Sequence, residues 1–344
     1  MKYLPLGDSG LSSSVIGFGA WAIGGGEVWG GITDDSRALS TIRAAMESGI
    51  NLLDTAPAYG WGHSERLIAE AVRGSRDEVL LATKCGLWWD DDRGSYFTKF
   101  NGRDLFRSLR PDTISIEVER SLKDLNTDRI DLYQVHWPAI EPCKTPVEDT
   151  MAALLGLRDQ GKIRAIGVCN LGADELNAYM ACGPIAAHQF RYSMLARDAE
   201  RDILPIGRDK GCAAITYMSL EQGLLTGKIG LDHEFKEGEF RSNRDWFPWL
   251  LPSNRQRILE MLGTWSPLCE QYQCTLSQLV LAWTLSRPGV THVLAGARRP
   301  EHIAESAAAA DLQIQADDLI RISNDIDSLG EPFTEESTGD PGQP

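Results

Sequence analysis

The sequence predicts an α/β fold, a single (β/α)8 barrel of the TIM type over residues 1–330, and three observations support this fold class. Eight short apolar runs recur along the chain, at residues 15–19, 50–54, 79–84, 130–136, 165–170, 186–190, 213–217 and 292–296. Each run is almost continuously apolar, which is typical of parallel strands buried on both faces. A longer amphipathic segment follows most of the runs, and nothing resembling a linker divides the chain. The alternation also fits a doubly wound open sheet, and the barrel is the preferred interpretation.

The first dozen residues precede the repeat and contain a turn at residues 7–10, so we expect an N-terminal hairpin that caps the bottom of the barrel. Gly49 and Gly74 mark the ends of the first two helices, and Pro111 opens the third. The buried face of this third helix repeats at spacings of four and three residues: Ile114, Val118, Leu122 and Leu125.

A further helix is predicted to begin after residue 145, because three start signals coincide there. Thr145 provides an N-cap, Pro146 occupies the first helical position and Glu148 the third, and the helix stops near Gly161. Residues 88–110 and 229–252 are long, polar and aromatic, so we expect them to be substrate loops at the C-terminal face. Residues 331–344 are rich in Glu, Gly, Pro and Thr and are expected to form a flexible tail.

Composition excludes several classes of function. The formal net charge is -15 and no long Lys/Arg run occurs, which argues against a nucleic-acid partner. No apolar stretch approaches the about 18 residues of a membrane span, and no signal peptide is visible, so a cytoplasmic protein is expected. The seven cysteines are scattered without close pairing, so neither a disulfide framework nor a metal site is expected. An oligomer is possible, but the sequence does not indicate one.

Polar side chains stand at the ends of the apolar runs, where a barrel places its active site. These residues are Asp54, Lys84, His136, Asn170, Gln189 and Tyr217. Each could instead merely cap its own strand. A lysine at the end of so apolar a run needs a carboxylate beside it, and Asp54 is the candidate.

Two nucleotide-binding motifs are weak. Residues 17–22 match a relaxed GxGxx[GA] pattern, but no acidic residue closes a second strand about twenty residues later, as a Rossmann ribose contact requires. Residues 223–228 look like a phosphate loop but are one residue short of a Walker A motif, and Ile229 replaces the required Ser/Thr.

Five segments together resemble the aldo-keto reductase family, and the likeness extends over roughly residues 1–330. The segments are 51–60 (NLLDTAPAYG), 82–84 (ATK), 128–137 (DRIDLYQVHW), 161–168 (GKIRAIGV) and 296–300 (GARRP). Within the family the chain is most similar to bacterial members related to general-stress and inositol-cluster reductases. The resemblance implies a barrel that binds NADPH extended across its mouth, without a Rossmann domain, and reduces an aldehyde or ketone.

The resemblance also implies a catalytic group of four. Tyr59 would protonate the developing alkoxide as general acid, and Lys84 would help a phenol with an ordinary pKa of about 10 to exchange protons near neutrality. Asp54 would hold Lys84 charged and oriented. His136 would donate a hydrogen bond to the substrate carbonyl.

Cofactor contacts carried over by position comprise Trp21, Cys169, Asn170, Gln189, Tyr217, Leu220, Gln222, Gly223, Leu225, Lys228, Gly296, Arg298, Arg299, His302 and Glu305. Asn170 and Gln189 match residues that hold the carboxamide, and Tyr217 matches the aromatic residue that stacks on the nicotinamide. Arg298 and Arg299 match basic residues around the 2′-phosphate, which favours NADP. Cys169 replaces the usual serine, and His302 and Ser306 also depart from the family pattern.

Aromatic and basic residues expected around the mouth suggest a sugar-derived or other polar carbonyl substrate. They are Trp61, Trp88, Trp89, Trp137, Trp246, Arg241 and Arg244. The tryptophans could instead pack the loops together, and the arginines could belong to the cofactor site. Two rival functions remain: an NADPH-binding regulatory protein like the potassium-channel β subunits, and an unrelated lyase or isomerase with Lys84 as a Schiff-base residue.

Overall fold

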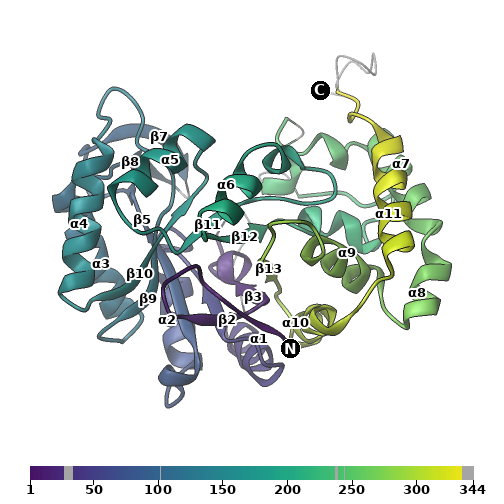
Figure 1. Ribbon diagram of the computed structural model, residues 1–344, viewed down its shortest axis with the longest axis horizontal. Coiled ribbons are helices and arrows are strands. Elements are labelled where there is room, and N and C mark those ends of the chain that lie inside the picture. Colours follow the sequence, from purple (N-terminus) through teal and green to yellow (C-terminus); the bar gives the residue numbers. More distant parts are fainter. Residues whose placement is uncertain (27–33, 101, 237–238, 244, 335–344) are drawn as a thin grey trace.

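Eight parallel strands form a closed barrel in the computed structural model, which describes residues 1–26, 34–100, 102–236, 239–243 and 245–334 (Figure 1). The strands, in their order around the barrel, are β3 (Ile16–Gly19), β4 (Leu52–Asp54), β5 (Leu80–Cys85), β9 (Ile130–Val135), β10 (Ile163–Cys169), β11 (Ala187–Arg191), β12 (Ala213–Tyr217) and β13 (His292–Gly296). Each of the eight expected runs is one of these strands. The barrel is therefore confirmed over the open sheet.

The interior of the barrel has an apolar layer at the N-terminal ends of the strands. Leu52, Leu132 and Leu294 belong to this layer. The N-terminal hairpin, β1 (Tyr3–Pro5) and β2 (Ser12–Ser14), adds Leu6 and Leu11 to the same cluster. The hairpin thus closes the bottom of the barrel, as expected.

The register of β5, β9 and β10 aligns the residues on which the site depends. Lys84 pairs with Gln134 across β5 and β9, and Gln134 pairs with Gly167 across β9 and β10. A Cβ atom at Gly167 would lie 2.9 Å from Cγ of Gln134, so the missing side chain leaves the space that Gln134 fills. The polar layer at the C-terminal ends is built on this register.

Helices surround the barrel, with α3 and α4 on one side of the view and α7, α8 and α11 on the other (Figure 1). Their bounds are α1 (Asp35–Glu47), α2 (His63–Ala71), α3 (Pro111–Asp124), α4 (Val147–Asp159), α5 (Ala173–Cys182), α6 (Ile203–Asp209), α7 (Pro252–Gly263), α8 (Ser266–Tyr272), α9 (Leu276–Leu285), α10 (Pro300–Ala308) and α11 (Ala316–Leu329). None of the helices in the described residues is long and apolar enough to span a membrane.

The predicted start of α3 at Pro111 is confirmed, whereas the predicted cap of α4 is wrong. The α4 helix begins at Val147 with Pro146 as its N-cap residue, and no side chain caps it. Pro146 has φ -57 and ψ 143, which is extended backbone, so the helix cannot include it. Thr145 therefore lies one residue too early to act as the cap.

The two expected substrate loops differ in structure. Part of the first folds into a small antiparallel sheet of β6 (Leu87–Trp88), β8 (Arg103–Arg107) and β7 (Ser95–Phe100). The described part of the second contains only the 3-10 turns η6 (Phe240–Ser242) and η7 (Pro248–Leu250). Residues 335–344 of the expected tail lie outside the described residues.

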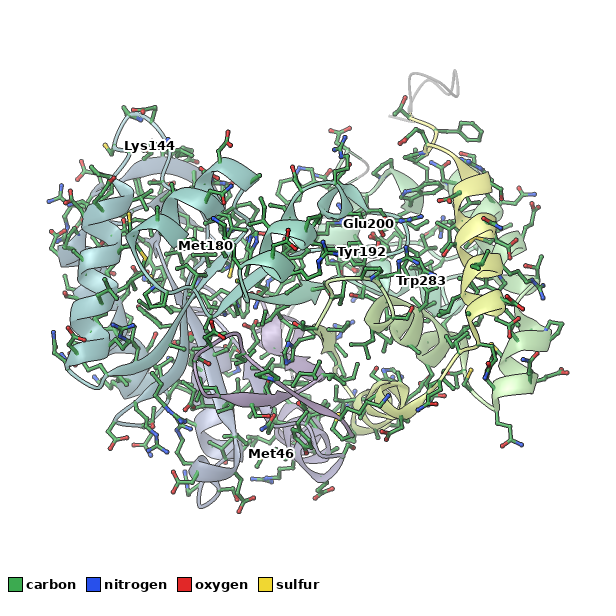
Figure 2. The ribbon with its side chains drawn as sticks, viewed as in Figure 1. Met46, Lys144, Met180, Tyr192, Glu200 and Trp283 are labelled. Atoms are coloured by element: carbon green, nitrogen blue, oxygen red, sulfur yellow. The ribbon has the colours of Figure 1, made fainter. Side chains whose placement is uncertain are left out.

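A polar network fastens η4 (Asp198–Glu200) to α9. The Tyr192 hydroxyl donates to Glu200 at 2.5 Å, and Tyr192, Glu200 and the buried Trp283 lie near one another in Figure 2. Arg287 places its guanidinium 4.8 Å from the centroid of the Trp283 ring and 3.6 Å from Glu200. This network fixes the chain directly after β11.

Candidate active site

Asp54, Lys84 and Tyr59 meet in one hydrogen-bonded group over the C-terminal end of the barrel. Asp54 ends β4, Lys84 is the fifth residue of β5, and Tyr59 lies in the turn after β4. The Lys84 Nζ donates to Asp54 Oδ1 at 2.7 Å, to the Thr55 carbonyl at 2.8 Å and to the Tyr59 hydroxyl at 3.3 Å. Three acceptors therefore surround one ammonium group.

Burial alone would discharge Lys84, which is only 1% exposed. Burial does oppose the charge, but the Asp54 carboxylate outweighs it, so the pKa of Lys84 is raised above its ordinary value. Lys84 is therefore an ammonium throughout the neutral range. A permanently protonated amine is a poor nucleophile, so the site does not favour Schiff-base chemistry at Lys84.

The Tyr59 phenol keeps its proton in this environment. Burial raises the pKa of Tyr59 to about 12, although Lys84 lowers it, and Asp54 raises it further. Lys84 lowers the pKa of Tyr59, as expected, but in the free protein burial raises this pKa by a larger amount. A protonated phenol beside a cation has a proton that it can donate.

His136 follows β9 and lies beside the Tyr59 ring. The two ring centroids are 5.9 Å apart and nearly perpendicular, at 81°. Burial, and then the positive charges of Lys84 and Arg107, hold the pKa of His136 well below its usual range. The imidazole is therefore neutral and has a single N–H to donate.

Two glycines let the Tyr59 turn pack against η1 (Ala20–Ile23). A Cβ on Gly24 would lie 2.9 Å from the Tyr59 carbonyl oxygen, and one on Gly60 would lie 2.1 Å from the Gly24 carbonyl oxygen. Gly60 also has φ +68, in the left-handed region that favours glycine. The backbone of Tyr59 is thus held by direct contact between two loops.

Gln134, which the sequence pattern did not single out, lies at the centre of the polar layer. Its Nε2 donates to Asp54 Oδ2 at 3.0 Å, and Gln189 Nε2 donates to the same oxygen at 2.8 Å. Gln134 lies two residues before His136 and one strand from Lys84. Its position inside an apolar run gave little signal, but side chains two residues apart on a strand point the same way, and this could have identified it.

The residues expected to hold a carboxamide form a second group next to His136. Asn170 donates from Nδ2 to the His136 carbonyl at 2.9 Å and accepts from the Tyr217 hydroxyl at 2.7 Å. Asn170 adopts φ 59, a left-handed conformation that asparagine tolerates. The Cys169 thiol donates to Gln134 Oε1 at 3.6 Å, so it faces the barrel interior.

The segment expected to wrap a pyrophosphate is η5 (Glu221–Thr226) with the residues around it. Leu225 is buried, while Gln222 and Gly223 have φ 56 and 97. Glu221, which the sequence analysis missed, is also buried and is paired with Arg191 at 2.9 Å. This ion pair anchors an otherwise unusual backbone.

The residues predicted to bind the adenosine end of the nucleotide lie near α10. Arg298 and Arg299 directly precede the helix, Lys228 pairs with Glu305 at 3.5 Å, and His302 is exposed. The remaining predicted contacts lie nearby: Gly296 ends β13, Leu220 precedes η5 and Trp21 belongs to η1.

Arg241 belongs to the second expected substrate loop but lies close to this basic group. Its guanidinium donates to the Gln222 carbonyl at 3.4 Å and pairs with Glu239. Partial desolvation and the charge of Arg241 lower the pKa of Arg298, while Glu239 raises it. The alternative placement of Arg241, beside the cofactor segment, therefore fits the structure better. Arg244 lies outside the described residues.

The expected substrate tryptophans separate into buried and accessible ones. Trp88 is completely buried, donates to Asp91 at 2.7 Å and stacks on Arg93. It is therefore not accessible to a substrate, in contrast to the prediction. Trp246 is 57% exposed and contacts Phe240. An aromatic cluster flanks the mouth on the β6–β8 side: Trp61, Trp89, Phe97, Phe100 and Trp137.

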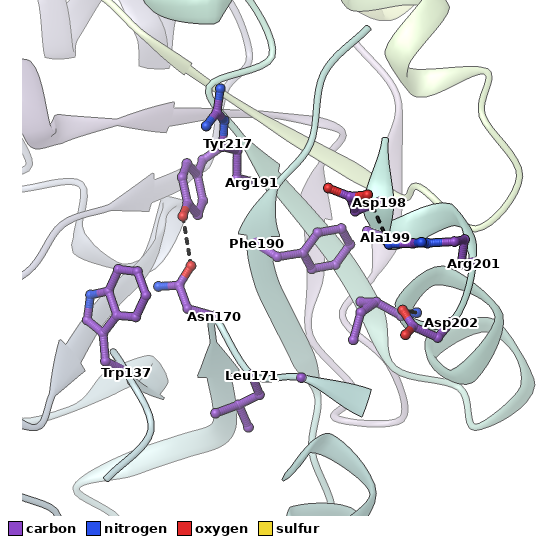
Figure 3. A pocket seen from close by; sticks show the side chains of 12 residues that line it. Trp137, Asn170, Leu171, Phe190, Arg191, Asp198, Ala199, Arg201, Asp202 and Tyr217 are labelled. Carbon is purple, nitrogen blue, oxygen red and sulfur yellow. Dashed lines mark hydrogen bonds and ion pairs between the residues drawn. The ribbon is translucent and has the colours of Figure 1, made fainter. Parts of the chain in front are cut away.

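A cavity of about 360 Å³ opens beside Asn170 and Tyr217 (Figure 3). Trp137 borders it on one side, and Phe190 and Arg201 on the other. Figure 3 shows the hydrogen bond between Asn170 and Tyr217 facing this space. Asn170 also binds the His136 carbonyl, but the side chains of Asp54, Tyr59, Lys84 and His136 do not themselves line the cavity.

Comparisons with known proteins agree with this geometry. A family model described as "Aldo/keto reductase family" matches residues 15–326. An "NADH-specific methylglyoxal reductase" of Escherichia coli is 41% identical over 315 residues, covering 91% of this chain and 95% of that protein. An aldo-keto reductase of Bacillus subtilis is 39% identical over 306 residues, covering 87% and 86%.

Solved structures match over nearly the whole chain. The glycerol dehydrogenase of Gluconobacter oxydans superimposes with a TM-score of 0.80 at 32% identity, covering 97% of this chain and 95% of that one. A holo-form aldo-keto reductase of Bacillus halodurans has a TM-score of 0.72 at 25% identity, covering 97% and 98%.

Proposed function

We propose that this chain, which belongs to the aldo/keto reductase family, reduces an aldehyde or ketone to the alcohol. NADPH would be the reductant, and Tyr59 would be the general acid. One observation carries this proposal. The ammonium of Lys84 contacts both the Asp54 carboxylate and the Tyr59 hydroxyl, so a protonated phenol stands next to a fixed positive charge.

The residues divide the chemistry between them. A reduced nicotinamide, when bound, would supply a hydride to the carbonyl carbon. Negative charge then develops on the carbonyl oxygen, and Tyr59 donates its proton there. Lys84 stabilises the phenolate that remains, since it already lies 3.3 Å from the hydroxyl. The neutral imidazole of His136 donates a hydrogen bond to the same oxygen and orients it.

The donors present fit a nicotinamide dinucleotide. Asn170 and Gln189 bring two side-chain amides, which can pair with a carboxamide, and Tyr217 brings a flat ring beside them. Gln222 and Gly223 have left-handed backbone in the segment that would wrap the pyrophosphate. Arg298 and Arg299 would hold phosphate at the far end.

NADPH is proposed over NADH because two arginines precede α10, where a 2′-phosphate would need them. NADH is the second candidate, favoured by the printed specificity of the Escherichia coli relative. Kinetics with both nucleotides separate the two. Replacing Arg298 and Arg299 by Ala should raise the KM for NADPH at least tenfold, because each charge-assisted bond contributes about 1.5–3 kcal/mol, and should leave NADH unaffected. Wild-type preference for NADH would overturn the proposal for NADPH.

The proposed substrate is a polar carbonyl, such as a sugar-derived aldehyde or ketone. The aromatic cluster offers flat faces for a ring or a short polar chain, and the adjoining cavity carries the charged side chains of Arg201 and Asp202. The names of two relatives mention methylglyoxal and glycerol, both small and polar.

Tyr59→Phe is the test of the mechanism. The variant keeps the ring between Trp21 and His136 but removes the proton, so turnover should fall by about 10²- to 10⁴-fold while nucleotide affinity stays within about twofold. Carbonyl-dependent loss of NADPH absorbance measures turnover, and quenching of tryptophan fluorescence measures affinity.

Tyr96→Phe, at a tyrosine that is 56% exposed on β7, is the matched control and should retain full activity. Retained turnover in Tyr59→Phe would refute Tyr59 as the acid. Tight nucleotide binding by the wild type, without turnover of any carbonyl in a broad panel, would instead favour the regulatory function of the channel β-subunit type.

A further inference from the structure

Gln134 occupies the centre of the polar layer, and the family resemblance gave it no role. Its side chain is completely buried and lies between Asp54, Cys169 and Gln189. We propose that Gln134 is a positioning residue, which fixes the Asp54 carboxylate that holds Lys84 and ties it to the residues that would grip the cofactor carboxamide. This inference rests on the proposed reductase function.

The Asp54 carboxylate has two oxygens with different partners. Oδ1 accepts from the Lys84 ammonium at 2.7 Å. Oδ2 faces away from that cation and accepts from Gln134 at 3.0 Å and from Gln189 at 2.8 Å. A buried carboxylate whose second oxygen had no donor would be costly, so these two amides make the buried charge sustainable.

The orientation of the Gln134 amide follows from its neighbours. An ionised carboxylate only accepts hydrogen bonds, so the amide nitrogen must face Asp54 and the carbonyl must face the other way. There Oε1 accepts from the Cys169 thiol at 3.6 Å and from Gln189 Nε2 at 3.5 Å. Gln134 therefore joins the carboxylate to both neighbours at once.

Gln189 depends on this arrangement. Its Nε2 has two hydrogens, and the contacts to Asp54 and to Gln134 account for both. Its carbonyl oxygen then remains to accept from a carboxamide N–H. Fixing Gln189 by two donated bonds would set where that oxygen points, which links cofactor seating to the acid group.

The barrel is shaped around the Gln134 side chain. Gly167 is its register partner on β10, and a Cβ there would lie only 2.9 Å from Gln134 Cγ. Lys84 is its register partner on β5. Gln134 is therefore packed in one position, at the same level of the barrel as Lys84, and it contacts Asp54, the partner of that lysine.

Gln134→Glu is the decisive variant, because it keeps the shape and makes the donor depend on pH. When protonated, the introduced carboxyl can donate to Asp54 as the amide does. When ionised, it cannot donate and repels Asp54. We expect kcat near the wild-type value at low pH and a fall of at least tenfold, relative to wild type, as pH rises through the pKa of the introduced carboxyl.

Gln134→Leu removes the donor at every pH and should lower kcat at least tenfold without that pH dependence. It should also raise the dissociation constant of the nucleotide by about threefold to tenfold, measured by fluorescence quenching without turnover, because Gln189 loses one of its anchors. If this variant does not fold, Gln134→Glu alone decides the matter.

Tyr133→Phe is the matched control, since Tyr133 precedes Gln134 on β9, is equally buried and belongs to the outer core cluster. It should keep the wild-type pH profile and nucleotide affinity. A wild-type pH profile for Gln134→Glu would overturn the positioning role. If the wild-type protein shows no Tyr59-dependent turnover, the proposed function fails instead, and the nucleotide affinity of the variants still tests the link between Gln134 and Gln189.

Discussion

Lys84 shows how one side chain can depend on several others. Its ammonium is buried, and it stays charged because the Asp54 carboxylate outweighs the effect of burial on its pKa. The same contacts place it 3.3 Å from the Tyr59 hydroxyl. Stability and the proposed proton transfer therefore rest on the same ion pair.

Lys84→Met should damage both properties. The Asp54 carboxylate would be left buried without its cation, which typically costs about 3–5 kcal/mol of unfolding free energy. The pKa of Tyr59 would rise further without its positive neighbour, so turnover should become barely detectable. Urea denaturation and carbonyl-dependent NADPH oxidation measure the two effects.

The control is Lys162→Met, which removes the partly exposed pair between Lys162 and Glu119. Such pairs contribute at most about 1 kcal/mol, so this variant should resemble the wild type. Equal loss of stability in the two variants would contradict the special role of the buried pair.

At this scale the sequence predicted residues at strand ends well and residues inside strands poorly. Asp54 and Lys84 stood out because charged side chains ended apolar runs, and the structure brings them into contact. Gln134 was hidden because a polar residue within an apolar run does not reveal which way it points. Trp88 was misplaced because a loop position says nothing about burial.

Between β5 and the helices α2 and α3 lies a second set of buried carboxyls. Glu117 on α3 accepts from the Gly86 amide through both oxygens, at 3.1 and 3.0 Å, directly after β5. Glu65 on α2 accepts from Thr83 at 2.8 Å. Burial raises the pKa of Glu117 to about 8 and of Glu65 to about 7.

These shifts predict that the protein loses stability as pH rises through neutrality. The folded chain keeps protons on Glu65 and Glu117 that the unfolded chain releases above about pH 4.5. The stabilisation is complete below that pH and is lost as pH rises to about 8. The unfolding free energy should fall by up to about 1.4 kcal/mol per pH unit for each such proton.

Denaturation at pH 6 and pH 8.5 measures this slope, and Glu117→Gln should reduce it because the amide does not titrate. Glu119→Gln, at an exposed position on the same helix, should leave the slope unchanged. A wild-type slope in Glu117→Gln would show that another group is responsible.

Elements were predictable where one pattern dominated. All eight barrel strands followed from short, almost continuously apolar runs, because parallel strands are buried on both faces. The cap of α4 was wrong, since Pro146 itself is extended and displaces Thr145 from the helix end. The sheet of β6, β7 and β8 was not foreseen, because its strands alternate only in part and its register shifts near Tyr96.

The whole barrel is divided along its axis. Apolar side chains fill the N-terminal end, where the hairpin adds Leu6 and Leu11, and charged and amide side chains fill the C-terminal end. The division keeps stability and chemistry in different layers. The side chains at the strand ends predicted the polar layer and the turn at residues 7–10 predicted the hairpin, but the sequence did not reveal which hairpin residues enter the barrel.

Leu6→Ala tests the bottom layer. Leu6 is 0% exposed inside the barrel, so its truncation should cost about 2–5 kcal/mol of unfolding free energy while kcat stays near wild type. Leu4→Ala, on the same hairpin but 40% exposed, should cost less than about 1 kcal/mol. A large loss of kcat in folded Leu6→Ala would show that the two layers are coupled.

The contact between Gly24 and Gly60 matters to anyone who wishes to evolve this chain toward new compounds. Any side chain at either position would displace the loop that carries Tyr59, whatever was gained elsewhere. Mutant libraries should therefore hold both glycines constant and diversify Trp61, Trp89 and Trp137, where variety can reshape the entrance without moving the Tyr59 hydroxyl.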